Sequence, residues 1–166
     1  MTIPYAEPLT VRAPADLVIP EPPRRGEAGG EPCFPCSPGT AESAIWADEH
    51  WTLHNPGSTA LVGAVWLASR RHFDSYADMP ADLGATLAGV CGRVERAVLG
   101  LGAVGRVHVY RYGDGGAHFH LWFVPRPLGR LDMSGPYLGV WEDAMTPADK
   151  ADIEAAGEKI AAAMSA

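Results

Sequence analysis

The sequence predicts an α+β domain, in which an antiparallel sheet carries one long helix and a second helix lies at the C-terminus. Three observations lead to this fold class. Several short segments have strand-like patterns, residues 80–101 carry apolar side chains at helical spacing, and a helix-start signal precedes the last stretch of the chain. The 166 residues fit a single domain, because domains typically have roughly 50–250 residues.

The composition narrows the class of function. Hydrophobic residues make up 47% of the chain and charged residues 20%, as in an ordinary soluble globule. A net charge of −7 with only two lysines argues against nucleic-acid binding and membrane-surface binding, although a small anionic ligand needs only a local site. No apolar run reaches the ~18 residues of a membrane span.

The N-terminus predicts a cytoplasmic protein and an extended arm. It has no charged region followed by an apolar region, so we expect no secretory signal, and the three cysteines are expected to be reduced thiols. Nine of the fifteen prolines fall in the first 38 residues. Residues 1–31 are therefore expected to form an extended proline-rich arm with little helix or strand, before a domain at residues 32–166.

The first predicted elements are strands. Residues 44–47 and 51–54 flank Asp48-Glu49-His50 and predict a short hairpin. Residues 55–58 (NPGS) have the composition of a turn. The continuous apolar run at residues 59–68 predicts a strand covered on both faces.

The long helix is predicted from Pro80 to about Leu101. Its apolar stripe has spacings of three and four residues and consists of Leu83, Leu87, Val90, Val94, Val98 and Leu101. Residues 106–112 and 118–124 follow as strands, joined by a glycine-rich turn at residues 112–117, and prolines end the second strand.

The remaining chain is predicted to be irregular at residues 126–145 and helical after that. Thr146 is the expected N-cap, Pro147 the first helical residue, and Asp149 the third. Ile153, Ile160 and Met164 form one modest apolar face. This completes the predicted order of strands, long helix, strands and C-terminal helix.

Cys33 and Cys36 form a C-x-x-C pair that suggests a metal site. Two thiolates at this spacing can share a tetrahedral zinc ion, but they can also form a redox pair. A redox pair normally sits at a helix N-terminus, whereas this one lies in a proline-rich loop. Zinc is favoured, a redox or purely structural role stays open, and a closed zinc site needs two more ligands.

Two histidines follow the glycine-rich turn on one strand. His118, His120 and Trp122 should share one face, because alternate residues of a strand point to the same side. The residues between them are apolar and should face the core. Backbone N–H groups of the turn could meet an anion there. The simpler alternative is a pair of partly buried histidines on a sheet.

The other histidines and the third cysteine carry weaker signals. Arg70-Arg71-His72 follows the apolar strand, and His72 is the residue of the three best suited to ligate a metal. Surface roles are expected for His50 and His54. Cys91 is expected to be a small core residue.

The histidine-bearing strand resembles a known motif. His118-Phe-His120-Leu-Trp122-Phe-Val-Pro125-Arg126 is similar to the H-φ-H-φ-H-φ-φ motif of the histidine triad (HIT) superfamily, which is frequently followed by Pro-Arg and includes the galactose-1-phosphate uridylyltransferases. The C-x-x-C pair, the hairpin, the strand ending in Arg-Arg-His and the long helix occur in the order that the family shows. The resemblance covers about residues 32–127.

The resemblance implies a fold and an activity. The fold is an antiparallel sheet of about five strands with a long helix across one face, and members commonly form homodimers through that helix or a sheet edge. Members hydrolyse or transfer at the α-phosphorus of dinucleoside polyphosphates, nucleoside phosphoramidates or nucleotide sugars. Their middle histidine is the nucleophile and forms a nucleotidyl-histidine intermediate. That position is His120 in this sequence.

The resemblance also implies a structural zinc ion. In zinc-bearing members the metal is held by the C-x-x-C pair, the histidine of the basic corner and the first histidine of the motif. Those positions are Cys33, Cys36, His72 and His118. Two cysteines and two histidines form a closed structural set.

One motif position departs from the family. Trp122 stands where members have histidine or glutamine, and its indole N–H is its only donor. Trp122 is expected to line the phosphate or leaving-group pocket, and Asn55, Asp114 and Gly116 are expected to contact substrate. Two alternatives to a nucleotide hydrolase or nucleotidyltransferase follow: a nucleotide-binding module with weakened or lost turnover, and a pathway enzyme repurposed for a non-nucleotide substrate.

Overall fold

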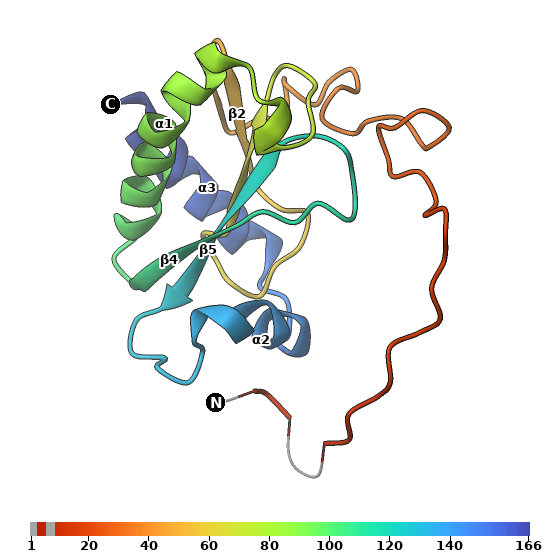
Figure 1. The fold of residues 1–166 in the computed structure, drawn as a ribbon. Helices are drawn as coiled ribbons and strands as arrows, with labels where there is room; N and C mark the ends of the chain where they lie inside the picture. The colour runs from red at the N-terminus through yellow and green to blue at the C-terminus, as the bar shows by residue number, and fades with distance from the viewer. Residues whose placement is uncertain (1–2, 6–8) are drawn as a thin grey trace.

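The structure, a computed structural model, describes residues 3–5 and 9–166. Its centre is a five-stranded antiparallel sheet in the order β1-β2-β3-β5-β4 (Figure 1). The strands are β1 (Trp46–Ala47), β2 (Trp51–His54), β3 (Val65–Ser69), β4 (Val104–Tyr110) and β5 (His120–Pro127). The α+β class and the five-stranded sheet expected from the sequence are confirmed.

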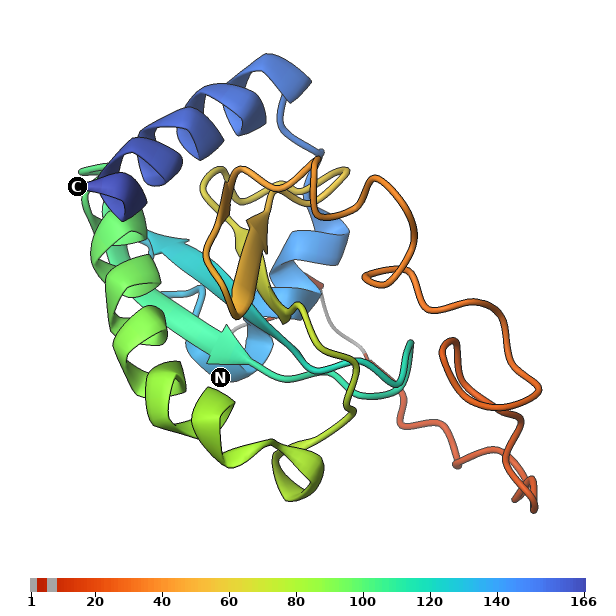
Figure 2. The same cartoon turned by 90° about the horizontal axis from the view of Figure 1, so that it is seen from above.

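Helices cover the two faces of the sheet unequally. The long helix α1 (Ala81–Leu99) and the C-terminal helix α3 (Lys150–Ser165) lie side by side on one face (Figures 1 and 2). The short helix α2 (Leu138–Ala144) buries Leu138 against side chains of the opposite face. Two 3-10 helices, η1 (Tyr76–Asp78) and η2 (Gly135–Tyr137), precede α1 and α2. Among the described residues, no helix has both the length and the hydropathy that crossing a bilayer requires.

The alternation along β5 divides its side chains between these two faces. Leu121 and Phe123 belong to the main core against α1 and α3, where four residues of the predicted helical stripe are also buried. Trp122 and Val124 belong to the second cluster with α2. The predicted core face of this strand is therefore confirmed, and His120 and Trp122 point away from α1.

Only the second half of the apolar run at residues 59–68 forms a strand. β3 begins at Val65, so the predicted start at Thr59 is wrong. Residues 61–64 form a turn, and the Ala64 N–H donates to the carbonyl oxygen of Leu61 at 2.9 Å. Gly63 has a φ of +92°, and a Cβ there would lie 2.5 Å from Leu101 Cδ1. Leu101, just beyond α1, packs over this turn, and Leu61 is buried in the second cluster with Val124 and Leu138, so both sides of the segment contact apolar residues.

Other boundaries also differ from the prediction: β1 spans Trp46–Ala47 rather than residues 44–47, and β4 spans Val104–Tyr110 rather than residues 106–112. Two further differences follow from backbone hydrogen bonds. β5 begins at His120 rather than His118, because Phe119 bonds through its backbone N–H to the Phe73 carbonyl at 2.7 Å. Helix α3 begins at Lys150 with Asp149 as its N-cap, so Thr146 does not cap it. The Ala148 N–H donates instead to the Thr59 carbonyl at 2.9 Å, which keeps this segment out of the helix.

Residues 126–145 are more regular than expected, since they contain η2 and α2. Their composition hides this because a seven-residue helix provides little periodicity to detect. Leu138 is fully buried and holds α2 against the sheet.

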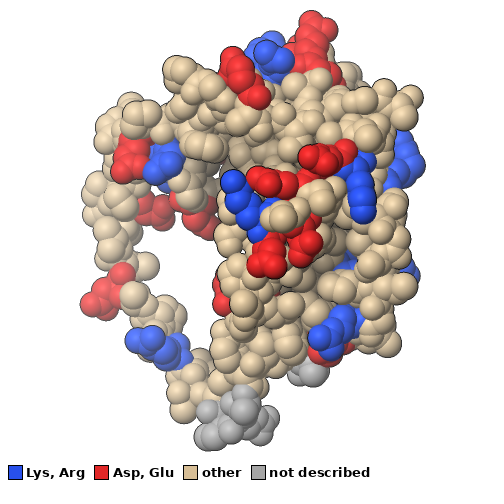
Figure 3. Space-filling model, turned by 180° about the vertical axis from the view of Figure 1, so that it is seen from behind, with Lys and Arg blue, Asp and Glu red and all other residues tan. Residues whose placement is uncertain are grey.

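Residues 9–31, which we call the N-terminal segment, lie on the side of the sheet away from α1 (Figures 1 and 2). Residues 1–2 and 6–8 of the predicted arm lie outside the described residues. Residues 9–31 contain no helix, and their one β-bridge joins Arg25 to Gly116 in parallel. Basic and acidic side chains are interspersed on the face shown in Figure 3.

A candidate metal centre beside a histidine-bearing pocket

Four side chains from distant parts of the chain converge at one edge of the sheet. Cys33 and Cys36 come from the loop before β1, His72 follows β3, and His118 precedes β5. One ligand atom from each lies within 4.8 Å of the other three. The four residues that the HIT resemblance implied as zinc ligands are therefore brought together.

The distances and hydrogen bonds fit a metal ligand set. His118 Nδ1 lies 3.2 Å from Cys33 Sγ and 3.5 Å from Cys36 Sγ, and His72 Nδ1 lies 3.4 Å from Cys36 Sγ. In a tetrahedral zinc site, sulfur and nitrogen ligands are about 3.6 Å apart. His118 Nε2 is 2.7 Å from the Ser69 carbonyl oxygen, which can only accept a hydrogen bond. The proton therefore sits on Nε2, and Nδ1 presents its lone pair to the cysteines.

The burial of His118 also favours a role as a metal ligand. The residue is 3% exposed, and burial lowers its pKa, which favours the neutral ring that a metal requires. The donor set of two thiols and two imidazoles, with one histidine held by a backbone carbonyl, fits a structural zinc ion. Three of its members are half-buried or exposed, so a cation could reach it.

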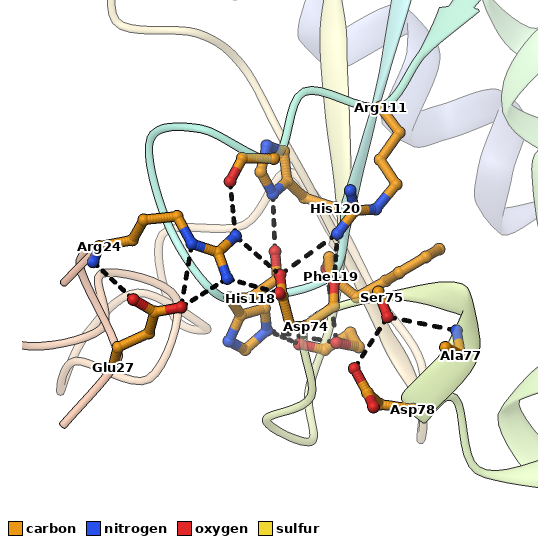
Figure 4. A network of polar contacts seen from close by, with 12 residues as sticks. Arg24, Glu27, Asp74, Ser75, Ala77, Asp78, Arg111, His118, Phe119 and His120 are labelled. Atoms are coloured by element: carbon orange, nitrogen blue, oxygen red, sulfur yellow. Dashed lines mark hydrogen bonds and ion pairs between the residues drawn. The ribbon is translucent and has the colours of Figure 1, made fainter. Parts of the chain in front are cut away.

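His120 lies next to this cluster with its ring orientation fixed. Its Nδ1 lies 2.7 Å from the carbonyl oxygen of His118 (Figure 4). Because that oxygen accepts, Nδ1 carries a proton, and in the neutral tautomer the lone pair lies on Nε2. The His118 residue thus contributes its ring to the metal cluster and its carbonyl to His120.

His120 lines a pocket of about 440 Å³ on the face of the sheet away from α1. The pocket is mostly apolar, with lining residues from the N-terminal loop, the glycine turn and the strands: Arg25, Cys33, Phe34, Pro35, Pro56, Gly57, Trp66, Tyr112, Gly115, Gly116, His118, His120 and Trp122. A pocket of this size can hold a small-molecule ligand.

A cross-strand row of rings runs beside His120. The strand register aligns His54 with Trp66, Trp66 with Trp122, and Trp122 with Tyr110. His54 stacks on Trp66 with ring centroids 4.1 Å apart, and the Trp66 and Trp122 rings are 6.4 Å apart. Trp122 therefore continues a sheet-wide aromatic row that borders the pocket.

The substrate contacts predicted from sequence are only partly at this pocket. Gly116 and Trp122 line it, whereas Asn55 and Asp114 are not among its lining residues, although Pro56 and Gly115 are. The side chain of Asn55 lies against Gly157 of α3. The roles of these four residues in substrate binding stay predictions.

Sequence reasoning missed a polar network that fastens the N-terminal segment to the site (Figure 4). Arg24 bonds Asp74 through Nη2 at 2.7 Å and the carbonyl of Gly113 through Nη1 at 2.6 Å. Arg111 donates to the Asp74 carbonyl at 2.6 Å. The hydrogen bond from Arg24 lowers the pKa of Asp74, so this carboxylate stays ionised. In the sequence, the only indication of this network is the pair Arg24-Arg25 within a proline-rich stretch.

His54 is buried rather than at the surface, which corrects the expected surface role. It is 4% exposed, and burial lowers its pKa to about 4. An unfolded chain takes up a proton at this histidine below pH ~6.5, whereas the folded chain does not until pH falls to about 4. The free energy of unfolding is therefore unaffected by His54 above pH ~6.5 and falls as the pH drops from ~6.5 to about 4, because only the unfolded chain takes up the proton there.

A His54→Phe variant should lose this acid sensitivity while keeping a ring beside Trp66. Between pH 7 and pH 4.5, urea unfolding of the wild type should show an extra stability loss of about 2–3 kcal/mol relative to the variant. The difference between the two proteins isolates His54 from other groups that titrate. Parallel pH profiles for both proteins would show that His54 is protonated equally in the folded and unfolded states.

Comparisons with known proteins identify the fold. No family profile and no curated sequence matches this chain. A hypothetical histidine triad nucleotide-binding protein from Sulfolobus tokodaii superposes with a TM-score of 0.59 at 19% identity, covering 80% of this chain and 92% of that one. A Zn-bound histidine triad family protein from Mycobacterium smegmatis has a TM-score of 0.56 at 24% identity, covering 76% and 87%.

A third similar structure is a HIT-like protein involved in cell-cycle regulation from Bartonella henselae. Its TM-score is 0.56 at 13% identity, and the match covers 73% of this chain and 85% of that chain. The likeness extends over most of each of these chains, and all three are described as histidine triad or HIT-like proteins. At these identities it shows that the chain has the histidine triad fold.

Proposed function

We propose that this chain, having the histidine triad fold, is a zinc-bearing nucleotide hydrolase or nucleotidyltransferase that works through His120. The observation that carries the proposal is the hydrogen bond from His120 Nδ1 to the His118 carbonyl. In the neutral imidazole, this bond fixes the tautomer whose lone pair lies on Nε2, and His120 lines a ligand-sized pocket. The nucleotide-binding and zinc-bound proteins with the same fold support the substrate class and the metal.

The proposed reaction has two displacements at the α-phosphorus. The Nε2 lone pair of His120 forms a P–N bond while the bond from phosphorus to the leaving group breaks, and the leaving group keeps the electron pair. Water or an acceptor hydroxyl then attacks phosphorus, the P–N bond breaks, and its electron pair returns to Nε2. The incoming oxygen loses its proton to solvent or to the departed group. Throughout, the His118 carbonyl stabilises the positive charge that develops on the imidazole.

The metal cluster would act on structure rather than on the reaction. Cys33, Cys36, His72 and His118 would hold the zinc ion, which would crosslink the three chain segments that carry them. This crosslink would hold His118, whose carbonyl orients His120. Phe34 and Pro35, between the two cysteines, form part of the pocket wall, so the same crosslink also shapes that wall.

Trp122 favours a second candidate, a module that binds nucleotides without turnover. Its ring packs beside Trp66 in the aromatic row. Its single hydrogen-bond donor is the indole N–H, at the motif position where family members have a histidine or glutamine donor. Loss of one donor to a transition state typically lowers a rate by ~10²–10³. The same aromatic row would hold a base or an aromatic leaving group by stacking.

A turnover assay with the zinc-loaded full chain separates the two candidates. The panel is a nucleoside phosphoramidate, a dinucleoside polyphosphate and a nucleotide sugar, and product is measured by chromatography. We expect nucleotide release from at least one substrate and a nucleotidyl adduct on the peptide that carries His120, detected by mass spectrometry after an alkaline quench. Calorimetric binding of a nucleotide without product or adduct would instead establish the binding module.

A further inference from the structure

We propose that Arg25 of the N-terminal segment binds the phosphate of the nucleotide that occupies the His120 pocket. This inference rests on the proposed function for the ligand class, but it assigns the contact to a residue outside the histidine-bearing strand. It follows from the lining of the pocket, from the way the backbone at Arg25 is held, and from the different partners of Arg24 and Arg25.

The pocket has one cation and no carboxylate among the described residues that line it. Arg25 is the only lysine or arginine in that lining, and no aspartate or glutamate is present. His120 enters its proposed reaction as a neutral ring, and Trp122 carries no charge. A phosphate bound here would therefore have the Arg25 guanidinium as its available positive charge.

The backbone holds Arg25 against the turn that leads into the histidine-bearing strand. Its carbonyl accepts a hydrogen bond from the Ala117 N–H at 2.8 Å, and residue 25 forms a parallel bridge with Gly116. A Cβ placed on Gly116 would lie 3.9 Å from the Arg25 Cβ. The N-terminal segment is thus attached to the glycine turn within four residues of His120.

Arg24 and Arg25 have different partners. Residues 24–27 form a turn in which the Glu27 N–H donates to the Arg24 carbonyl at 3.1 Å. The Arg24 guanidinium donates hydrogen bonds to Glu27, to Asp74 and to the Gly113 carbonyl, and Figure 4 shows the first two partners. Arg25 lines the pocket instead. Arg24 therefore positions the segment, and Arg25 is left to meet a ligand.

The one ion pair of Arg25 does not prevent this role. Its Nη2 lies 2.5 Å from Glu31 Oε2, but the two side chains are 48% and 73% exposed. Ion pairs at such exposure contribute little, because water and salt screen them. A phosphate offers the guanidinium two parallel charge-assisted hydrogen bonds within the pocket, which can replace this partner.

The test compares nucleotide and nucleoside binding by calorimetry with the zinc-loaded full chain. The probes are AMP, adenosine and inorganic pyrophosphate, and the variants are Arg25→Gln, Arg25→Lys and the control Arg12→Gln. Arg12 is an exposed arginine of the same segment, so its variant has the same charge change. Arg25→Gln should weaken binding of AMP and pyrophosphate about ten- to a hundredfold and leave adenosine affinity unchanged.

The remaining variants complete the expected pattern. Arg25→Lys should recover part of the loss, since lysine restores the charge without the bidentate geometry, and Arg12→Gln should behave as wild type. Unchanged phosphate affinity in Arg25→Gln, an equal loss for adenosine, or no binding of AMP and pyrophosphate by the wild type would each overturn the proposal.

The same variants distinguish this inference from the proposed function. AMP binding that depends on Arg25, without turnover or a His120 adduct, would uphold the phosphate contact and reject the enzyme. Turnover that depends on His120 but is unaffected in KM by Arg25→Gln would uphold the enzyme and reject the contact.

Discussion

Replacing His120 by alanine is expected to abolish turnover, with a rate loss of about 10³-fold or more, because the variant lacks the atom that forms the P–N bond. The ring is half-buried, and among the described residues it bonds only to the His118 carbonyl. Its removal should therefore leave the metal cluster and the pocket in place. Initial rates on the substrate cleaved by the wild type measure the effect.

The control for His120→Ala is His50→Ala, which removes an imidazole from the hairpin turn outside the pocket lining. It should keep wild-type rates. Zinc content and thermal midpoint should be the same in both variants, which excludes misfolding as the cause of the loss. Activity at the wild-type level in His120→Ala would remove this residue from the nucleophile's role.

Removing the metal is expected to have the largest effect on stability. Zinc bound at a thousandfold excess over its dissociation constant contributes about 4 kcal/mol to folding. For a chain of this length, that corresponds to a fall in the thermal midpoint of roughly 8–16 °C. Purified protein should contain one zinc per chain by elemental analysis, and a strong chelator should lower the midpoint by this amount.

Cysteine substitutions provide the matched comparison for metal removal. Cys36→Ser breaks the ligand set and should reproduce the destabilisation in the absence of chelator. Cys91 lies in α1 outside the cluster, so Cys91→Ala should retain zinc and its response to the chelator. A wild type that contains no zinc, or a midpoint indifferent to the chelator, would contradict the structural role of the metal.

The sequence predicted the elements whose residues show a clear period. The stripe of α1 and the alternation around His120 depend on local spacing, and both match the structure. Boundaries were less predictable where a distant residue decides them. Thr59 begins an apolar run but not a strand, because Leu101 packs over Gly63, and Thr146 fits an N-cap pattern but Ala148 bonds to Thr59.

The ligand set of the candidate metal site was predictable from the family resemblance rather than from local periodicity. Cys33 and Cys36 are close in sequence, but His72 and His118 are far from them, and only the family resemblance suggested the complete ligand set. The role that we propose for Arg25 could not be foreseen, because it depends on a bridge to Gly116, some ninety residues away. A local sequence pattern in a proline-rich segment cannot predict a contact with a residue so far away in the sequence.

The acceptor that orients His120 is a main-chain oxygen, and this has a consequence for how the site can evolve. Point mutations change side chains, so no single replacement at position 118 can delete that oxygen while the local backbone keeps its course. The imidazole of His118 can be exchanged, and the metal lost, without removing the group that holds the neighbouring tautomer. Mutational drift can therefore remove the metal crosslink without deleting the acceptor itself, whose position then depends on the neighbouring backbone hydrogen bond from the Phe119 N–H to the Phe73 carbonyl.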